Sequence, residues 1–577
     1  MVKDRVPREI GAKAPLRNWY AIDWKLATKR VRNLRGRIYR ATQREQWNQV
    51  RSLMKLMLRS YSNLLMAVRR VTQINRGKRT AGIDGVTVAT AKERVELVNK
   101  WQEYQPWRVK PVKRVYIPKA NGKLRPLGIP CICERVAQAI VKNALEPSWE
   151  AKFEAHSYGF RPGRSCHDAI QQSWIRLQHG RDTWILSADI QGAFDNICHN
   201  YLLETLGNVP GRELIKQWLK TGYVEFGVLH QTASGTPQGG IISPLLANIA
   251  LDGLEEVLNQ FKHRQQVEIK SGKTAGQTRW KYPPIYGYIR YADDFIITAK
   301  TQEDILNIIP HVETWLSQRG LCLNSEKTQV VSIHDGFDFL GFNIRQFNGK
   351  CLPKPQRKKV IAKLREIKAW LVAHPHVSPA AVIHYLNPIL RGFANYYKHG
   401  VYRETFEYID YRMFHMLFCW AWKRHPNKPK SWVLRHYFGR VTQDSLVFRT
   451  SLIDRNGKPR IAQIYRTRAT PATRHIKVQG KASPDDPSLK AYWQRRQTRY
   501  GKSYFARGSY LYQIAQQQGW KCPVCGDSLF NGEPMDTHHI VPVAQGGTDV
   551  IANRVHLHTT CHQQVHGRGR SFAFAEA

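Results

Sequence analysis

YIRYADDFIITA, residues 288–299, is the stretch that decides the fold. Its apolar side chains are typical of a buried strand, yet the adjacent carboxylates Asp293 and Asp294 interrupt it. An unpaired carboxylate that leaves water costs several kcal/mol or more. A tight turn between two strands would bring both carboxylates to one sheet edge, where bound Mg²⁺ would offset their repulsion. The pair alone also fits a surface turn, because Asp is common in turns.

A second carboxylate block favours the metal site over the surface turn. ILSADIQGAFDNI, residues 185–197, predicts an apolar strand that ends in Asp189, with Asp195 as a cap at the next turn or helix start. A strand-end aspartate and a pair at a hairpin tip can together hold two metal ions about 4 Å apart. One ion would activate an attacking 3′ hydroxyl and the other would neutralise a triphosphate, which is phosphoryl transfer by positioning and charge.

Length and charge narrow the class of partner. The chain has 577 residues, too many for one core, so about three to five domains are expected. Lys and Arg number 89 against 44 Asp and Glu, and the net charge of +45 repels itself unless a polyanion neutralises it. Nucleic acid is favoured over an anionic membrane surface, because no apolar run is long enough to span a bilayer. The first residues hold no apolar signal-peptide core, which predicts a cytoplasmic location.

Hydrophobic periodicity predicts the order of the elements. Residues 25–44 predict a helix with a narrow apolar stripe, whose eight Lys and Arg fit phosphate contact better than a solvated face. The other expectations, in chain order, are a helix over 47–71, a hairpin over 114–130, a strand over 183–190, a helix over 247–261, a polar loop over 263–284, a strand over 337–344, helices over 357–438 and a weakly patterned basic segment over 466–510. SPDDP, residues 483–487, predicts a linker, and the last 60 or so residues predict a small separate unit.

Several blocks carry a resemblance to a known family. They are YADD with its flanking strands, ADIQGAFDNI (188–197), SGTPQGGIISPLLANIALDGLE (234–255), IPKANGKLRPLGIP (117–130), SYGFRPGRSCHDAI (157–170), GLCLNSEKTQVV (320–331) and FDFLGF (337–342). Together, and in this family's order over roughly 80–345, they resemble reverse transcriptases, in particular those encoded by mobile group II introns.

The resemblance implies a role for each matching residue. Asp189, Asp293 and Asp294 match the aspartates that bind two Mg²⁺ ions. Phe194 matches the aromatic residue that rejects a 2′ hydroxyl and so selects dNTPs. The remaining matches are Lys119 and Arg125, which would grip the incoming triphosphate from either side of the hairpin turn, and Gln238, which would lie beside the nascent base pair.

The chain after the polymerase blocks resembles further parts of these proteins. LRGFANYY, residues 390–397, resembles the thumb called the maturase domain or domain X, which implies binding of intron RNA and help with its splicing. Aromatic side chains stacked on unpaired bases and cations on phosphates would supply that binding. Residues 466–515 match the family's DNA-binding segment by position and positive charge only.

Two knuckles near the C-terminus predict a zinc site. KCPVCG (521–526) supplies Cys522 and Cys525, and HLHTTCHQQVH (556–566) supplies Cys561. His558, placed as His-x-x-Cys before Cys561, is the expected fourth ligand. Zn²⁺ takes four soft or imidazole ligands, often from two such knuckles. A redox Cys-x-x-Cys motif is the alternative, and the second knuckle argues against it. Relatives usually carry a second Cys-x-x-Cys pair where this chain has His558, so the chain departs from the family's pattern at this position.

DTHHIVPVAQGGTDVIANRVHLHTTCHQQVH, residues 536–566, resembles an HNH nuclease, a hairpin and helix around one divalent cation. The match makes His538 a metal ligand and His539 the general base that activates water. It makes Asn553 the residue that orients this base. His562 and His566 are four residues apart, so they share one helix face and could both bind the metal.

We therefore expect an α+β multidomain protein with right-hand polymerase fingers and palm, an α-helical thumb, a basic DNA-binding segment and a small ββα-metal HNH domain. The expected boundaries are 1–85 for an N-terminal basic helical extension, 86–345 for fingers and palm, 346–465 for the thumb, 466–515 for the DNA-binding segment and 516–577 for the endonuclease. The expected function is that of a group II intron-encoded protein, whose partners are intron RNA, double-stranded target DNA and dNTPs.

Two other functions are considered. A retron or CRISPR-associated reverse transcriptase would lack the thumb block and the HNH tail. A splicing factor without enzymatic activity would keep the fold, but it would usually have lost the three aspartates, which are intact here.

Overall fold

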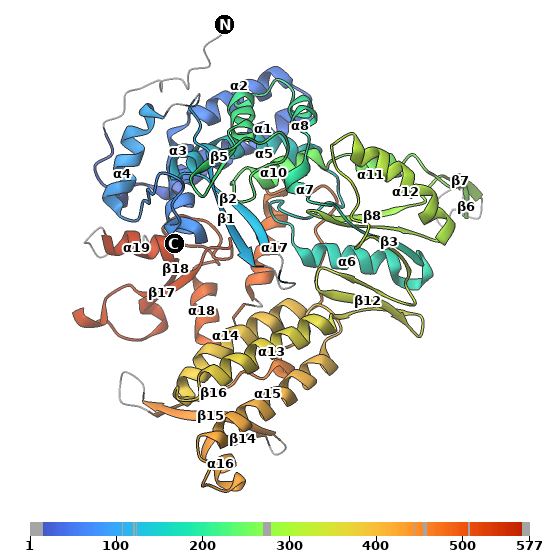
Figure 1. The fold of residues 1–577 in the computed structure, drawn as a ribbon. Coiled ribbons are helices and arrows are strands. Elements are labelled where there is room, and N and C mark those ends of the chain that lie inside the picture. Colours follow the sequence, from blue (N-terminus) through green and yellow to red (C-terminus); the bar gives the residue numbers. More distant parts are fainter. Residues whose placement is uncertain are drawn as a thin grey trace.

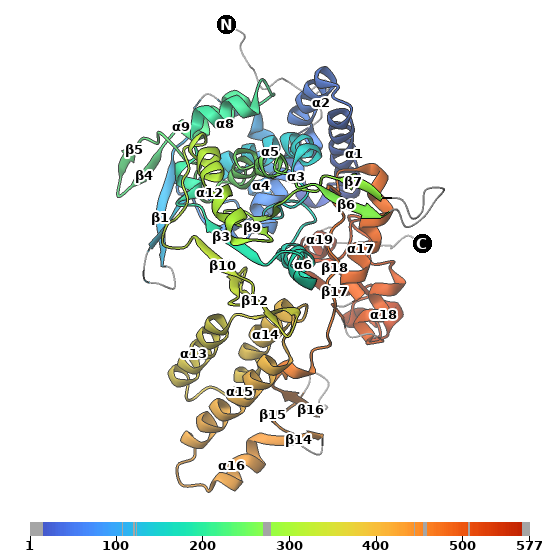
Figure 2. The ribbon, with the colours of Figure 1, turned by 90° about the vertical axis from the view of Figure 1, so that its right-hand side faces the viewer.

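The computed structural model describes residues 15–104, 106, 108–118, 122, 124–268, 278–442, 445–453, 459–502, 504–505 and 508–567. The N-terminal helices lie above the palm sheet, and the thumb helices project below it (Figure 1). Both views place the C-terminal segment back beside the N-terminal helices (Figures 1 and 2). None of the helices described here is long and apolar enough to cross a bilayer.

The N-terminal region is a group of packed helices. Its elements are α1 (Trp24–Gln43), α2 (Trp47–Arg59), α3 (Tyr61–Arg69), α4 (Ala91–Asn99) and α5 (Ile132–Lys152). Asp23 caps α1 by accepting from the Leu26 backbone N–H at 2.9 Å. The single helix expected over 47–71 is divided at Ser60, which ends α2 and caps α3 through the Asn63 N–H.

Two four-stranded sheets follow. The fingers sheet has the order β2-β1-β4-β5, and the palm sheet has the order β10-β3-β9-β8 with every neighbouring pair antiparallel. The fingers strands are β1 (Val112–Pro118), β2 (Leu124–Ile129), β4 (Tyr223–Glu225) and β5 (Val228–His230). The palm strands are β3 (Trp184–Asp189), β8 (Gly287–Tyr291), β9 (Asp294–Ala299) and β10 (Gln329–Ser332). The β1–β2 pair is the hairpin expected over 114–130.

The palm sheet is buried on both faces, which explains its nearly continuous apolar strands. Side chains on one face, such as Leu186 and Ile297, share a core with α10 (Ser243–Ala250) and α12 (Gln302–Ser317). The next residues along each strand, Ile185 and Ile296, point the other way and share a core with α6 (Cys166–Leu177) and the thumb. Each such fully buried side chain stabilises the fold by about 1.5–3 kcal/mol.

Three expected elements have different forms. The helix expected over 247–261 is broken: α10 ends at Ala250, and α11 (Leu254–Leu258) begins after Gly253, whose φ of 102° no helix continues. The strand expected over 337–344 is a hairpin of β11 (Phe337–Phe339) and β12 (Phe342–Phe347), extended by β13 (Lys350–Pro355). The polar loop expected over 263–284 contains an exposed hairpin of β6 (Gln265–Glu268) and β7 (Thr278–Lys281).

The thumb combines helices with a small sheet that periodicity did not predict. Its helices are α13 (Arg357–Ala373), α14 (Pro379–Tyr397), α15 (Arg403–Lys423) and α16 (Lys430–Tyr437). Its strands, in the order β14-β15-β16, are β14 (Phe438–Thr442), β15 (Ser445–Ile453) and β16 (Pro459–Gln463). Phe438 and Phe448, which are register partners in this sheet, and the adjacent Val447 are buried in the same core as the thumb helices.

The segment expected to be a linker, 483–487, is instead docked against the N-terminal helices. Asp485 forms an ion pair with Arg35 of α1 at 2.6 Å, and Arg35 also pairs with Glu146 of α5 at 2.9 Å. The Trp493 indole N–H donates to the Ser483 carbonyl at 2.8 Å. The sequence suggested a linker because Pro and Asp favour turns, but here Asp485 is the charge partner of the half-buried Arg35, and Asp486 accepts from the Ser488 N–H at 2.9 Å. The helix α17 (Lys490–Lys502) follows.

The last unit is also not isolated. It consists of α18 (Tyr510–Gln517), the antiparallel pair β17 (Met535–His539) and β18 (Arg554–His558), and α19 (Thr559–Gly567). Its Leu557 and Val565 share one apolar core with Trp19 and Trp24 of the N-terminal region. The Gln564 side-chain amide donates to the carbonyls of Tyr20 and Ile22 across this interface.

The remaining helices of the palm are α7 (Ala193–Asn196), α8 (His199–Leu206) and α9 (Arg212–Lys220).

Candidate active sites

The three predicted aspartates meet at one edge of the palm sheet. Asp189, the last residue of β3, is the register partner of Asp294, the first residue of β9. Asp293 lies in the tight turn between β8 and β9, directly after Ala292, which has a φ of 60°. Because Tyr291 and Asp294 are paired across this turn, Asp293 is held over the edge where β3 ends.

The three carboxylates at this edge oppose one another's ionisation. Desolvation and the carboxylates of Asp293 and Asp189 raise the pKa of Asp294 to about 7. Desolvation and the Asp189 charge also raise the pKa of Asp293. Carboxylates that oppose each other's ionisation in this way are the arrangement that a bound divalent cation relieves. The donor set therefore fits Mg²⁺.

A lysine not singled out from the sequence completes this edge. Lys327 Nζ lies 2.6 Å from Asp189 Oδ2, and the Asn324 backbone N–H donates to the Asp189 carbonyl at 2.8 Å. The hydrogen bond to Asp189 raises the pKa of Lys327, which keeps this ammonium charged. Both residues belong to the GLCLNSEKTQVV block, so the signal was a charged residue within an already recognised motif.

Phe194 lies beside this edge on α7. Its side chain is buried, and its ring packs edge-to-face against Phe160 with centroids 6.0 Å apart. The cap of α7 is Gly192, with a φ of 55°, rather than Asp195, which lies inside the helix. Asp195 was expected to cap because Asp is favoured at that position, but the chain needs a left-handed residue there, which glycine supplies.

Arg125, Gln238 and Asp195 form a hydrogen-bonded chain above Phe194. Arg125 Nε donates to Gln238 Oε1 at 2.9 Å, and Gln238 Nε2 donates to Asp195 Oδ2 at 2.9 Å. Gly239, with a φ of 127°, allows this loop to pack on β2, because a Cβ there would lie 2.5 Å from the Gly128 carbonyl oxygen. The chain borders a cavity of about 450 Å³ between the fingers strands and residues 231–238. Lys119 lies outside the described residues.

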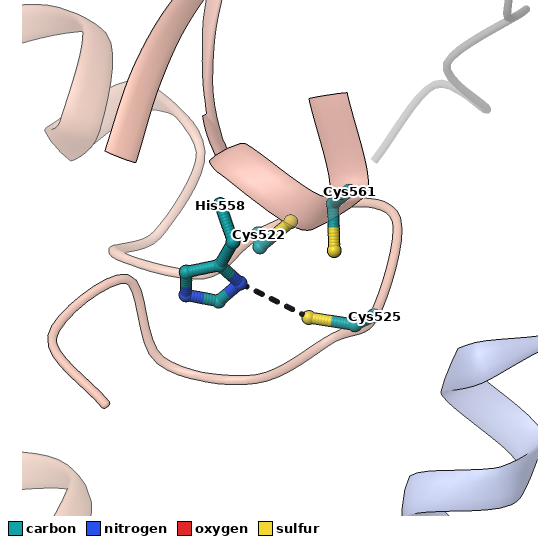
Figure 3. A group of neighbouring side chains, drawn as sticks. All are labelled: Cys522, Cys525, His558 and Cys561. Carbon is teal, nitrogen blue, oxygen red and sulfur yellow. Dashed lines mark hydrogen bonds between the residues drawn. The ribbon is translucent and has the colours of Figure 1, made fainter. Parts of the chain in front are cut away.

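The four predicted zinc ligands converge. The ligand atoms of Cys522, Cys525, His558 and Cys561 all lie within 4.8 Å of one another, and all four residues are buried (Figure 3). His558 Nδ1 faces Cys525 Sγ at 3.3 Å, while its Nε2 lies 3.1 Å from the Ser528 carbonyl. That carbonyl can accept only from Nε2–H, which leaves Nδ1 as the free lone pair that a metal needs. Three thiols and one imidazole at this spacing suggest a zinc site.

Arg69 of α3 reaches this cluster from the N-terminal region. Its guanidinium donates to Thr560 Oγ1 at 2.6 Å and to Cys561 Sγ at 3.3 Å. The same group lies over the Trp24 ring, 4.8 Å from its centroid. A buried cation beside thiolate ligands partly balances their negative charge, so the cluster forms part of the interface between the two regions.

The predicted nuclease ligands also form a cluster. The ring nitrogens of His538, His562 and His566 lie within 4.8 Å of one another, on β17 and α19. Asp536 Oδ2 lies 3.2 Å from His562 Nδ1, which orients that ring. Desolvation and the neighbouring imidazoles lower the pKa of His538 to about 4, so this ring is neutral near pH 7, the form that binds metals.

The structure gives the predicted base, His539, a hydrogen-bond partner that the sequence did not predict. His539 Nε2 lies 2.7 Å from Asp549 Oδ1, so Asp549 and not Asn553 makes the direct hydrogen bond among the described contacts of His539. Asn553 instead closes the intervening loop, because its side chain bonds both backbone groups of Val541 and the Thr548 carbonyl. Asn553 would thus act on His539 only through the loop. A lone aspartate in a turn gave no signal for this role.

Four family models match the chain. They are the N-terminal domain of reverse transcriptase over residues 19–101, reverse transcriptase (RNA-dependent DNA polymerase) over 117–344, the group II intron maturase-specific domain over 359–438, and HNH endonuclease over 522–568. These matches follow the order of the blocks recognised in the sequence.

Two known proteins are similar to parts of this chain. Protein YkfC of Escherichia coli (strain K12) is 36% identical over 301 residues, which cover 48% of this chain and 78% of that protein. The group II intron-encoded protein LtrA of Lactococcus lactis subsp. cremoris is 29% identical over 416 residues, 59% of this chain and 69% of that protein. A solved telomerase structure from Candida albicans has a TM-score of 0.30 at 13% identity, over 57% of this chain and 61% of that one, which is too weak to support a conclusion. The chain belongs to the family of group II intron-encoded reverse transcriptases with a maturase domain, and its C-terminal part carries an HNH endonuclease domain.

Proposed function

We propose that this chain copies its intron RNA into DNA at a cut target site, assists splicing of that RNA and nicks one strand of the target DNA. The observation that carries the proposal is the meeting of Asp189, Asp293 and Asp294 at one edge of the palm sheet. The nuclease unit of the same chain holds a cluster of three histidines, which we take as a second metal site, with His539 as its base. A polymerase that needs a primer and a nuclease that creates a 3′ hydroxyl are complementary activities.

At the palm edge, each side chain would have a separate task. The three aspartates would hold Mg²⁺, which when bound supplies the positive charge that nucleotidyl transfer needs. Arg125 would contact the triphosphate, and Gln238 would hold that guanidinium in place through their hydrogen bond. Phe194, backed by Phe160, would fill the space below the sugar and clash with a 2′ hydroxyl. Lys119 would contact the same triphosphate as Arg125.

In the nuclease unit, each histidine would also have a separate task. His538, His562 and His566 would hold one divalent cation, which when bound stabilises the charge on the scissile phosphate. His539 would take a proton from water as Asp549 stabilises the resulting imidazolium. Cys522, Cys525, His558 and Cys561 would hold a structural Zn²⁺ that fixes the knuckles below this site.

The nucleic-acid partners follow from the domains and the charge. The maturase domain implies contact with group II intron RNA, and the net charge of +45 supplies the phosphate affinity. We assign target DNA to residues 466–515, where Arg474, Lys481 and Arg495 are among the cations of a basic segment. Salt-dependent binding of both nucleic acids is expected. The family's order of events is binding of the RNA, reverse splicing into DNA, nicking of the opposite strand and extension of the new 3′ end.

Primer extension on an RNA template with Mg²⁺ tests the proposal. The full-length protein should extend a DNA primer annealed to RNA, prefer dNTPs to rNTPs, and nick a duplex that carries the intron insertion site. Failure of the wild-type protein to extend any primer, with splicing assistance retained, would favour a splicing factor without enzymatic activity. Extension without RNA-splicing assistance or nicking would favour a reverse transcriptase of the retron kind.

A further inference from the structure

The turn that carries Asp293 is held from behind by a buried polar chain. Arg290, which is 1% exposed, donates through Nη1 to the Ala292 carbonyl at 3.2 Å and to Asn248 Oδ1 at 3.1 Å. Asn248, on α10, is 2% exposed and donates through Nδ2 to the Gly159 carbonyl at 2.9 Å. One arginine and one asparagine therefore connect the turn, α10 and Gly159.

The two backbone segments that Arg290 and Asn248 connect, at Gly159 and at Ala292, touch each other. A Cβ on Gly159 would lie 2.2 Å from the Ala292 backbone nitrogen, so no other residue allows this approach without displacement of the turn. The two segments also pair beside this contact, because the Arg290 N–H donates to the His156 carbonyl at 3.0 Å. The position of the turn is thus set by segment 156–160 as well as by its own hairpin.

The backbone is also strained at both positions that this hydrogen-bonded side-chain network holds. Ala292 has a φ of 60° and Phe160, directly after Gly159, has a φ of 59°. Left-handed backbone is uncommon for residues with a side chain, and it persists where surrounding contacts impose it. The carbonyl that Arg290 binds belongs to Ala292, and the carbonyl that Asn248 binds belongs to the residue before Phe160. The buried chain holds both strained positions.

We propose that Arg290 and Asn248 are positioning residues that set the Ala292–Asp293 turn and Phe160 in one fixed arrangement. The turn presents the aspartates, and the Phe160 ring packs against Phe194, the proposed sugar check. The chain therefore couples the placement of the metal ligands to the placement of the nucleotide sugar. The inference rests on the proposed roles of the aspartates and Phe194, whereas the contacts of Arg290 and Asn248 stand independently of those roles.

The charge of Arg290 faces a carboxylate region on its other side. Glu154 and Asp252 act electrostatically on Arg290, and Glu154 Oε1 accepts from the backbone N–H groups of Gly253 and Glu255 at 2.8 and 2.6 Å. The Nη1 group makes both hydrogen bonds that link the guanidinium to Asn248 and to the Ala292 carbonyl of the turn. Arg290→Lys keeps a cation but loses the planar donor, and Asn248→Asp keeps an acceptor but loses the amide donor. These two substitutions can therefore separate the hold on the Ala292–Asp293 turn from the hold on Gly159 and Phe160.

Single-turnover primer extension with the full-length protein tests the proposal. The variants are Arg290→Met, Arg290→Lys, Asn248→Leu, Asn248→Asp and Gly159→Ala. Arg290→Met should lower the maximal extension rate by about 100-fold, because a 1 Å displacement of a catalytic group costs that much, and it should raise the half-saturating Mg²⁺ concentration. Arg290→Lys should recover roughly a tenth of the lost rate, because an ammonium can replace one of the two hydrogen bonds.

The Asn248 and Gly159 variants separate the effect on the sugar check from the effect on the metal ligands. Asn248→Asp keeps the acceptor for Arg290 and loses the donor to Gly159, so it should reduce discrimination against rNTPs more than it raises the Mg²⁺ requirement. Asn248→Leu should change both. Gly159→Ala displaces the turn without altering either polar side chain, and it should raise the Mg²⁺ requirement as Arg290→Met does.

Arg319→Met is the matched control. Arg319 is another buried palm arginine, and it donates to the carbonyls of Ala250 at 2.9 Å and Trp315 at 2.6 Å, away from the turn. Loss of folded protein lowers the amplitude of the burst but leaves its rate, the Mg²⁺ requirement and the sugar preference unchanged. That pattern in Arg290→Met or Asn248→Leu, or equal changes in Arg319→Met, would overturn the proposal. If Arg290→Met does not fold, wild-type kinetics in Gly159→Ala and Asn248→Asp would overturn it instead. An inactive wild-type protein would refute the proposed function rather than this inference.

Discussion

The palm edge and the nuclease unit are both candidate metal sites, but they are assembled by different means. The palm site brings Asp189 to Asp293 and Asp294 only when distant strands pair, and its carboxylates raise one another's pKa. The nuclease unit draws its ligands from residues 522–566 and packs these histidines and buried thiols in a short ββα unit. The first site is set by the global fold and tuned by charge, whereas the second is set by local structure.

This difference predicts that the two sites fail independently. Asp294→Asn removes a carboxylate at the palm edge and nothing from the nuclease unit. We expect primer extension to fall by about 1000-fold, because electrostatic stabilisation of the transferring phosphate is the main contribution of this site. Nicking of supplied duplex DNA should remain at the wild-type rate.

Extension and nicking assays on the same preparation measure both rates. Asp335→Asn, at an exposed turn of the palm, is the matched control and should change neither. A parallel loss of nicking in a folded Asp294→Asn protein would show that the two sites do not act separately.

The reciprocal change is His539→Ala. Loss of a general base costs about 100- to 10,000-fold in rate, so nicking should fall within that range while extension of a supplied primer is unchanged. Asp549→Asn should lower nicking by a smaller factor than His539→Ala, because it removes only the partner of the base.

Gel-based nicking of an end-labelled duplex measures this effect. His334→Ala, an exposed histidine of the palm, serves as control. If Asn553→Ala reduced nicking as much as His539→Ala while Asp549→Asn had no effect, the orientation of the base would depend on Asn553, and the direct contact of His539 would be irrelevant.

The predictability of the two sites follows from the same difference. Asp189, Asp293 and Asp294 could be identified from apolar strands that end in carboxylates, and the zinc and histidine ligands from their spacing within one short segment. Lys327 and Asp549 could not, because a single charged residue in a turn is indistinguishable from a solvated one until the fold gives it a partner. The roles assigned to these residues and the expected domain boundaries stay predictions.

Elements were predictable where periodicity alone decides them. The helix α1 and the strand β3 lie within a residue or so of the expected ranges, because their apolar patterns match one secondary structure. The break at Gly253 and the hairpin turn at Leu340 depend on left-handed backbone, which periodicity does not report. Residues 483–487 were mistaken for a linker for another reason: Asp485 pairs with Arg35, which lies hundreds of residues away in the chain.

The zinc cluster tests whether local assembly also governs docking. Cys522→Ser should remove bound zinc and loosen the nuclease unit from α3, since Arg69 donates to Cys561 within the shared interface. Structural zinc contributes several kcal/mol to such small units, so the unit should become sensitive to proteolysis after residue 505. Nicking should be lost, while extension should fall little.

Zinc content by atomic absorption and limited proteolysis measure these outcomes. Cys419→Ser, at an exposed cysteine of α15, is the matched control. Full zinc content in Cys522→Ser, or loss of extension equal to the loss of nicking, would contradict a local structural role for the cluster.

A smaller effect is expected where charge, rather than metal, joins distant segments. Asp168 of α6 is fully buried, and its Oδ1 accepts from His475 Nε2 at 2.9 Å, Arg496 Nη2 at 2.7 Å and the Val478 N–H at 2.8 Å. Burial opposes ionisation, but these three donors outweigh it and lower the pKa of Asp168 to about 2. The carboxylate thus anchors part of the basic segment 466–515 to the palm.

The pH dependence of this anchor has a defined sign. Because the pKa of Asp168 in the folded protein is below that of a free Asp, about 3.9, its contribution is complete above about pH 4 and is lost as the pH falls toward 2. Asp168→Asn should cost about 3 kcal/mol near pH 7, because Arg496 loses its buried counter-charge. Hydrogen exchange should show the loss as faster exchange over residues 475–500, with little change in the nuclease unit. Equal loosening of both regions would mean that the palm anchors the nuclease unit as well, and the contrast between global and local assembly would not hold.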